Sequence, residues 1–261
     1  MQPSKNVIIA IPLYKNTFKS FEIVSLKSIF KHLGSFPIAF VVPQSLNTDF
    51  LQSYNFISNY SIERFDDHFF KSIDNYNLLM LSTDFYQRFA DYTYTLICQT
   101  DVFVFENQLE HWTTKNYDYI GAPWLDSSYN PLYLSYRRFF NTLKKLITGR
   151  EKLYPHINKV GNGGFSLRKN QAFIDICKKE QQQIQDFQTN KTKDNYHIED
   201  VFWSLYTPTK HNIKIPKYTE AVYFAWDINP KMAMKFTNGT LPFACHGFNK
   251  KQVKTFWKKY I

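Results

Sequence analysis

The stretch that most constrains the fold is the apolar run of residues 94–105, YTLICQTDVFVF, which carries Gln99, Thr100 and Asp101 in its middle. A β-branched and aromatic run of this length is typical of a strand in the centre of a sheet with both faces covered. A carboxylate there is costly unless it is paired, and a divalent cation is one possible partner. An N-cap, a turn or a salt bridge would also accommodate one Asp. Because ligands gather at the carboxyl ends of strands in open α/β sheets, we predict that Asp101 marks such a site.

Strand and helix patterns alternate on both sides of this run. Buried strands are predicted over 7–13 and 38–42, joined by a helix over 18–33 that Gly34 ends. Further elements are predicted as strands over 61–65, 117–120 and 218–226 and as helices over 76–90, 109–115 and 170–179. This order is that of βαβ units. We therefore predict one Rossmann-like α/β domain over residues 1–261, with a mixed, mainly parallel central sheet flanked by helices.

The composition is that of a globular protein, because 44% of the 261 residues are hydrophobic and 18% are aromatic. Three cysteines, Cys98, Cys177 and Cys245, are an odd number without metal-type spacing, which indicates buried reduced thiols in a cytosolic protein. The N-terminal apolar stretch is too short for a signal peptide, and no run reaches the ~20 apolar residues of a spanning helix. We expect a cytoplasmic protein, attached at most peripherally to the inner face of a membrane.

The formal net charge of +10 favours anionic partners, which include nucleic acid, an acidic membrane surface and a phosphorylated substrate. Two segments mix Lys and Arg with aromatic and aliphatic residues: an insertion at about 126–158 and the tail at about 249–261. Such segments can lie on an anionic membrane. The alternative is that each is an ordinary helix with a solvated basic face.

Glycine is scarce, yet three of the eight glycines fall within GNGG, residues 161–164. Glycine allows backbone with positive φ and close approach of the main chain to a ligand. An extended pattern follows the cluster, so we predict a binding floor that opens a strand. A simple turn is the alternative.

Two adjacent acids, Glu199 and Asp200, precede an apolar helical run. A helix N-terminus explains one of them, because its dipole favours negative charge. The second acid is a candidate for a general base in a pocket. A late histidine, His246, lies between small and aromatic residues, and a lone histidine of this kind is more often a core residue than a ligand.

The motifs QTD, YDYIGAPW, GNGGFSLR, EDVFW and CHGF, in this order, resemble those of GT-A glycosyltransferases. More narrowly, they are similar to a poorly characterised, mostly bacterial domain family grouped with these enzymes. The resemblance spans about residues 5–250. It implies a nucleotide-sugar donor whose diphosphate is held through Mn²⁺ or Mg²⁺ on an Asp-x-Asp motif. Here only the last acid, Asp101, is retained, and Gln99 replaces the first, which makes metal dependence less secure.

The resemblance also implies roles for individual residues. Asp101 and His246 would hold the metal, and Asp200 would be the general base of an inverting reaction, with Glu199 beside it. The expected donor and acceptor contacts are Tyr14, Gln99, Trp124, Asn162, Gly163 and Gly164. These residue types suit the chemistry, because the leaving diphosphate needs charge neutralisation and the attacking hydroxyl must lose a proton.

Two functions follow from these observations. The first is a glycosyltransferase that moves a sugar from a nucleotide-sugar donor to a glycan or lipid-linked acceptor in bacterial surface polysaccharide synthesis, with an anionic membrane surface as a further partner. The alternative is a non-catalytic nucleotide- or carbohydrate-binding module on a degenerate GT-A scaffold, because Gln99 replaces an acid. A nucleic-acid-binding protein is disfavoured, since neither an RNP-type aromatic motif nor zinc-ligand spacing is present.

Overall fold

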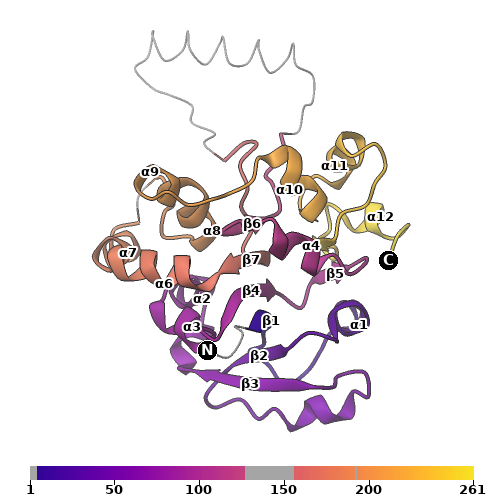
Figure 1. Cartoon of the computed structure of the whole chain (residues 1–261). Helices are drawn as coiled ribbons and strands as arrows, with labels where there is room; N and C mark the ends of the chain where they lie inside the picture. The colour runs from indigo at the N-terminus through magenta and orange to yellow at the C-terminus, as the bar shows by residue number, and fades with distance from the viewer. Residues whose placement is uncertain (1–4, 127–155, 192) are drawn as a thin grey trace.

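A large sheet forms the centre of the molecule in the computed structural model, which describes residues 5–126, 156–191 and 193–261 (Figure 1). Its strand order is β3-β2-β1-β4-β7-β6. The strands are β1 (Lys5–Pro12), β2 (Ile38–Pro43), β3 (Tyr60–Phe65), β4 (Tyr92–Cys98), β6 (Tyr119–Gly121) and β7 (Phe165–Lys169). β1 to β4 run parallel, whereas β7 is antiparallel to both β4 and β6. The predicted mixed, mainly parallel sheet is confirmed.

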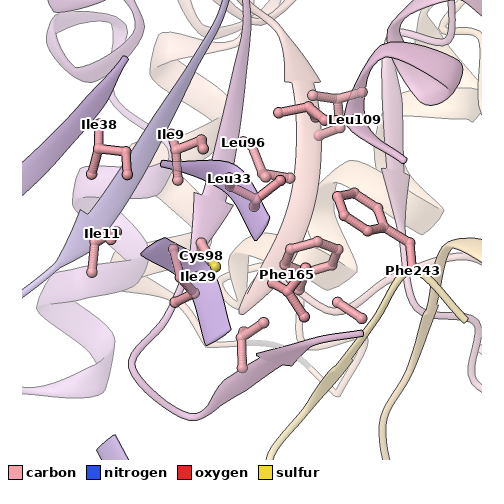
Figure 2. Close-up of a cluster of buried hydrophobic side chains, with 14 of the residues drawn as sticks. Ile9, Ile11, Ile29, Leu33, Ile38, Leu96, Cys98, Leu109, Phe165 and Phe243 are labelled. Atoms are coloured by element: carbon pink, nitrogen blue, oxygen red, sulfur yellow. The ribbon is translucent and has the colours of Figure 1, made fainter. Parts of the chain in front are cut away.

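Both faces of this sheet are buried, because successive residues of β1 enter different cores. Ile9 and Ile11 pack in a first hydrophobic cluster, and Ile8 and Ala10 pack in a second. In the first cluster, Ile29 and Leu33 of α1 (Ser20–Leu33) lie over the sheet (Figure 2). The second is covered by α2 (Ile73–Met80), α3 (Thr83–Arg88), α6 (Asn170–Lys179), α7 (Gln181–Thr189) and the π-helical turn Phe202–Tyr206, which directly follows α8 (Glu199–Val201).

A smaller sheet, of order β5-β9-β8, packs beside the large one. It consists of β5 (Val102–Val104), β8 (Ala225–Trp226) and β9 (Ala244–His246), and a third hydrophobic cluster covers it. The remaining elements are α4 (Leu109–Thr114), α9 (Thr207–Lys210), α10 (Tyr218–Phe224), α11 (Pro230–Phe236), α12 (Lys254–Trp257) and two short 3-10 helices, η1 (Asp49–Ser53) and η2 (Asp67–Phe70).

The run 94–105 is therefore two strands rather than one. β4 ends at Cys98, and β5 begins at Val102 in the other sheet. Between them the chain turns, with the Val102 N–H donating to the Gln99 carbonyl at 3.1 Å. The motif QTD thus follows the end of a central strand, as predicted.

Two other predictions were wrong in detail. The predicted helix over 76–90 is two helices, because the Ser82 hydroxyl accepts from the Phe85 N–H and starts α3. The predicted strand over 218–226 is mostly the helix α10, which buries Ala221, Val222 and Phe224, and only its last two residues form β8. Short apolar runs suit a buried helix as well as a strand, so tertiary packing decides between them.

Cys98, Cys177 and Cys245 are buried free thiols, as predicted. Within the described residues, no helix has the length and apolar character needed to cross a bilayer. Most of the predicted basic insertion, including residues 132–150, lies outside the described residues. In the tail, Trp257 is buried in the third cluster and Phe256 packs against it. Membrane attachment by the tail therefore stays a prediction that depends on its exposed lysines, Lys251, Lys254, Lys258 and Lys259.

Candidate functional site

A pocket of about 530 Å³ lies at the carboxyl ends of β1 and β4. These strands are parallel neighbours, so the residues that follow them meet at one edge of the sheet. The pocket is lined by residues from the loop after β1, the start of α1, the start of α2 and the QTD motif, among them Tyr14, Glu22, Lys71, Tyr76, Gln99 and Asp101. Tyr14 is 64% exposed. Three of the predicted site residues, Tyr14, Gln99 and Asp101, are thus brought together.

Glu22 is a buried carboxylate at this pocket that sequence reasoning missed. It accepts from the Lys15 Nζ at 2.7 Å, from the Lys19 backbone N–H at 2.8 Å and from the Thr100 hydroxyl at 2.9 Å. These bonds join the loop after β1, the start of α1 and the QTD motif. The one signal in the sequence is an acid in the first turns of the predicted helix over 18–33, and in the structure it is the third residue of α1, where it caps the helix start.

Asp101 belongs to a group of four charged side chains, here called the edge cluster. Its other members are Asp227, His246 and Lys250. Val102 pairs with His246 between β5 and β9, which places the preceding residue, Asp101, beside the imidazole. The distance from His246 Nε2 to Asp101 Oδ1 is 3.1 Å, and His246 Nδ1 lies 3.6 Å from Asp227 Oδ1. Asp227 also contacts Lys250 Nζ at 3.1 Å. Asp227 was not predicted.

The members of the edge cluster stabilise each other's charged forms. Burial lowers the pKa of His246, but its contact with Asp101 and the attraction of the Asp101 and Asp227 carboxylates outweigh burial and raise this pKa to about 9. Burial also acts to raise the pKa of Asp101 and Asp227, and their bonds and charge attraction to His246 outweigh it and lower both pKa values. His246 therefore carries a proton at neutral pH.

The predicted metal ligands, Asp101 and His246, are adjacent, but they contact each other instead of facing a common centre. His246 Nε2 also lies 3.2 Å from the Gln99 side-chain oxygen. In the described part of the chain, no group of three or more His, Cys, Asp or Glu side chains is arranged to hold a metal ion. Carboxylate, imidazole and amide groups are ligand types that suit Mn²⁺. As arranged, however, these residues do not fit a divalent cation.

The glycine segment, residues 161–164, runs past the edge cluster. Asn162 has the left-handed φ of +67°, and its buried amide donates to Asp227 Oδ2 at 2.6 Å and accepts from the Gly164 N–H at 3.1 Å. Asn162 therefore holds Asp227 in place. Its predicted contact with the donor or acceptor stays a prediction.

Gly163 and Gly164 are needed for close packing. A Cβ on Gly163 would lie 1.5 Å from Glu199 Oε1, and one on Gly164 would lie 2.3 Å from His246 Nε2. A Cβ on Gly161 would lie 2.1 Å from the ring of Trp124. Trp124 thus covers the start of the glycine segment, and Glu199 and His246 contact its end.

On the Glu199 side, the charges are fully buried. Arg168 of β7 and Glu199, here called the core pair, have side chains that are 0% and 6% exposed and lie 3.0 Å apart between Nη2 and Oε2. Arg168 also donates to the Tyr86 hydroxyl at 2.8 Å and to the Ser166 hydroxyl at 3.0 Å. Burial raises the pKa of Glu199, and Arg168 opposes that rise. Glu199, predicted beside the base, is thus engaged in the core.

Asp200 is directed differently from its neighbour. It is only partly buried, and its carboxylate accepts from the backbone N–H groups of Gly163 and Val201. Burial raises the pKa of Asp200, and these hydrogen bonds oppose the rise. α8 begins at Glu199, so the predicted helix start is confirmed. The structure brings Asp200 to the glycine segment, and its role as a base stays a prediction.

The comparisons agree with this architecture. The model of a family described as "Protein of unknown function (DUF5672)" matches residues 59–246. The crystal structure of core-mannan synthase A (CmsA/Ktr4) from Aspergillus fumigatus, in its Mn/GDP form, is similar with a TM-score of 0.53 at 11% identity, covering 83% of this chain and 73% of that one. No curated protein matches the chain. At such low identity the structural likeness concerns the fold alone. The chain belongs to the DUF5672 family, and its fold is similar to that of a GT-A glycosyltransferase.

Proposed function

We propose that this chain is a glycosyltransferase that moves a sugar from a nucleotide-sugar donor to a glycan or lipid-linked acceptor. The observation that supports this most is the pocket at the carboxyl ends of β1 and β4, where Tyr14, Gln99 and Asp101 meet on a GT-A-like sheet. The similar mannan synthase structure is a Mn/GDP form, which agrees with a nucleotide in such a fold. The acceptor would be a surface glycan or its lipid-linked precursor.

In this proposal the donor occupies the pocket. The exposed ring of Tyr14 offers a face for the base to stack on, and the Gln99 amide offers a hydrogen bond to a ribose hydroxyl. Asp200 takes the proton from the acceptor hydroxyl as its oxygen bonds to the anomeric carbon and the bond to the diphosphate breaks. General base catalysis of this kind supplies a factor of ~10²–10⁴. The backbone N–H of Gly163 acts to keep this carboxylate in its charged form, which a base requires.

A divalent cation was predicted as cofactor, and the form of the mannan synthase that resembles this chain contains Mn. Because the side chains of the edge cluster contact each other, the step above uses the chain's own residues alone. Addition of Mn²⁺ and of EDTA belongs in every assay, since a requirement for Mn²⁺ would show that the cluster opens to bind it.

A second candidate function is a non-catalytic module that binds a nucleotide or a carbohydrate. Two observations favour it: Gln99 replaces an acid, and the edge cluster is closed on itself. Both candidates predict ligand binding. Only the glycosyltransferase predicts hydrolysis of the donor or transfer of its sugar.

A donor screen separates the two candidates. The purified chain is incubated with UDP-, GDP- and CMP-sugars, with Mn²⁺ or EDTA, and mass spectrometry follows donor hydrolysis and transfer, while thermal shift follows binding of UDP, GDP and CMP. Hydrolysis or transfer with one donor supports the enzyme. A thermal shift without turnover supports the binding module. Neither shift nor turnover with any donor would contradict both.

We also propose that the protein works in the cytoplasm, attached peripherally to the inner face of the membrane. The exposed lysines of the tail support this, since each is worth about 1 kcal/mol near an anionic surface. We expect flotation with anionic liposomes at low salt, weakening as salt rises, and none with neutral liposomes. Equal flotation with both lipids would contradict the attachment.

A further inference from the structure

The wall of the pocket formed by residues 70–76 carries a lysine that the proposed function leaves unused. Lys71 follows η2, precedes α2 and lines the pocket together with Ser72 and Ile73. Its side chain is exposed, and its charge attracts the Asp66 carboxylate, whose short contacts are with His68. An exposed ammonium group on a pocket wall is available to a ligand.

Two other lysines contact acids at this end of the sheet. Lys15 contacts Glu22 at 2.7 Å, and Lys250 contacts Asp227 at 3.1 Å. Asp101, which lines the same pocket, contacts His246. The acids at this end of the sheet thus already have cationic or hydrogen-bonding partners within the chain.

A diphosphate that enters the pocket needs positive charge and hydrogen-bond donors. Asp101 repels the diphosphate unless a cation lies between them. Gln99 is neutral at the position where the GT-A motif has a metal-binding acid, so it offers a metal ion no negative charge. The arrangement of the edge cluster does not fit a divalent ion, as described above. An ammonium group on the pocket wall satisfies the same need, because charge-assisted bonds to phosphate oxygens are among the stronger hydrogen bonds.

We propose that Lys71 binds the diphosphate of a nucleoside diphosphate in this pocket, and that this binding does not require a divalent cation. The inference rests on the proposed function for the class of ligand. It goes further in assigning the phosphate contact to the start of α2 rather than to a metal at the QTD motif.

Calorimetry of the full chain tests this proposal. UDP and GDP are titrated in EDTA and in Mn²⁺, and uridine, guanosine and inorganic pyrophosphate are titrated in EDTA to separate the base from the phosphates. Variants are Lys71→Met, which keeps the length but removes the charge, and Lys71→Arg, which keeps the charge. Lys178→Met is the matched control, because Lys178 is an exposed lysine of α6 outside the pocket wall.

We expect the wild type and Lys178→Met to bind a nucleoside diphosphate equally in EDTA and in Mn²⁺. Lys71→Met should weaken that binding by roughly tenfold or more, and Lys71→Arg should retain most of it. Nucleoside binding should be the same in wild type and Lys71→Met, while pyrophosphate binding should weaken in Lys71→Met. The affinity for the diphosphate should fall with salt more steeply in the wild type than in Lys71→Met.

Other outcomes would overturn the inference. Equal affinities for Lys71→Met and Lys178→Met would remove Lys71 from the site, and binding that appears only with Mn²⁺ would overturn metal independence. Both results leave the proposed glycosyltransferase standing. Absence of any nucleoside diphosphate binding by the wild type, in either buffer, would instead overturn the proposed function and this inference with it.

Discussion

The glycine segment separates two charged groups that differ in access to solvent. On one side is the core pair, with Arg168 and Glu199 almost fully buried and fixed by Tyr86 and Ser166. On the other is the edge cluster, in which the side chains of Asp101 and Lys250 are 24% and 39% exposed. Gly163 contacts the first group and Gly164 the second. The four-residue glycine segment thus has the buried core pair on one side and the more exposed edge cluster on the other.

The difference in burial determines what each group can do. A buried ion pair whose remaining atoms are hydrogen-bonded cannot exchange partners without leaving a charge unpaired in the core, at a cost of several kcal/mol. Asp101 and Lys250, the more exposed members of the edge cluster, exchange partners at a lower cost, because water screens their charges. The core pair therefore sets the shape of the site, and the edge cluster is the part that can respond to a ligand.

Asp200→Asn should give the largest effect. Asp200 is next to the core pair in sequence but is directed to the Gly163 N–H, and an amide there cannot accept the acceptor's proton. We expect turnover to fall by ~10²–10⁴-fold, with donor affinity and melting temperature nearly unchanged. Asp91→Asn, at an exposed position before β4, is the control. Full activity of Asp200→Asn would show that it serves only at the helix start, where Asn performs about as well as Asp.

Glu199→Gln tests the core pair. The substitution leaves the guanidinium of Arg168, which cannot lose its proton, without an anionic partner in the core. We expect the free energy of unfolding to fall by about 3–5 kcal/mol, measured by urea denaturation. A loss below about 1 kcal/mol would mean that this pair is as replaceable as a surface one, and the contrast between the two groups would disappear.

Gly163→Ala and Gly164→Ala add the same methyl group to each side of the glycine segment. At residue 163 the methyl pushes Glu199 away from Arg168, so we expect a loss of about 1–3 kcal/mol in unfolding free energy. At residue 164 it displaces His246 of the edge cluster, so we expect a smaller stability loss together with loss of nucleotide binding. Parallel denaturation and calorimetry measure both. The reverse pattern would exchange the roles of the two groups.

Asp227→Asn should give the smallest effect on stability. The amide oxygen can still accept from Asn162, and Lys250 can turn to solvent, so we expect a loss of about 1 kcal/mol in unfolding free energy. The measurement is the same urea denaturation as for Glu199→Gln. A loss as large as that of Glu199→Gln would show that the edge cluster is structural too.

The sequence predicted those features that depend on local pattern. The central strand and its polar end at Asp101 follow from an apolar run interrupted by QTD, and the start of α8 follows from adjacent acids before an apolar segment. What it missed depends on distant partners. In the sequence Glu22 resembles any acidic residue near a helix start. Its partner Thr100 is 78 residues away along the chain.

Asp227 was missed for a related reason. It follows β8, a strand of two residues that is too short to leave a pattern, and it lies directly after the segment 218–226 that we predicted as one strand. Arg168 lies in the extended pattern that became β7. The burial of its charge depends on Glu199, which comes 31 residues later in the chain. Charged residues show no periodicity that reveals their partners, so an internal ion pair is invisible until the fold brings it together.

The passage of the chain from β4 to β5 has a further consequence. Gln99, Thr100 and Asp101 are the residues at which the chain leaves the large sheet and enters the small one, and the Asp101 carbonyl accepts from the Gly247 N–H beyond β9. The same three residues therefore carry side chains into the pocket and form the joint between two sheets. The backbone link between the two sheets is thus also part of the pocket wall.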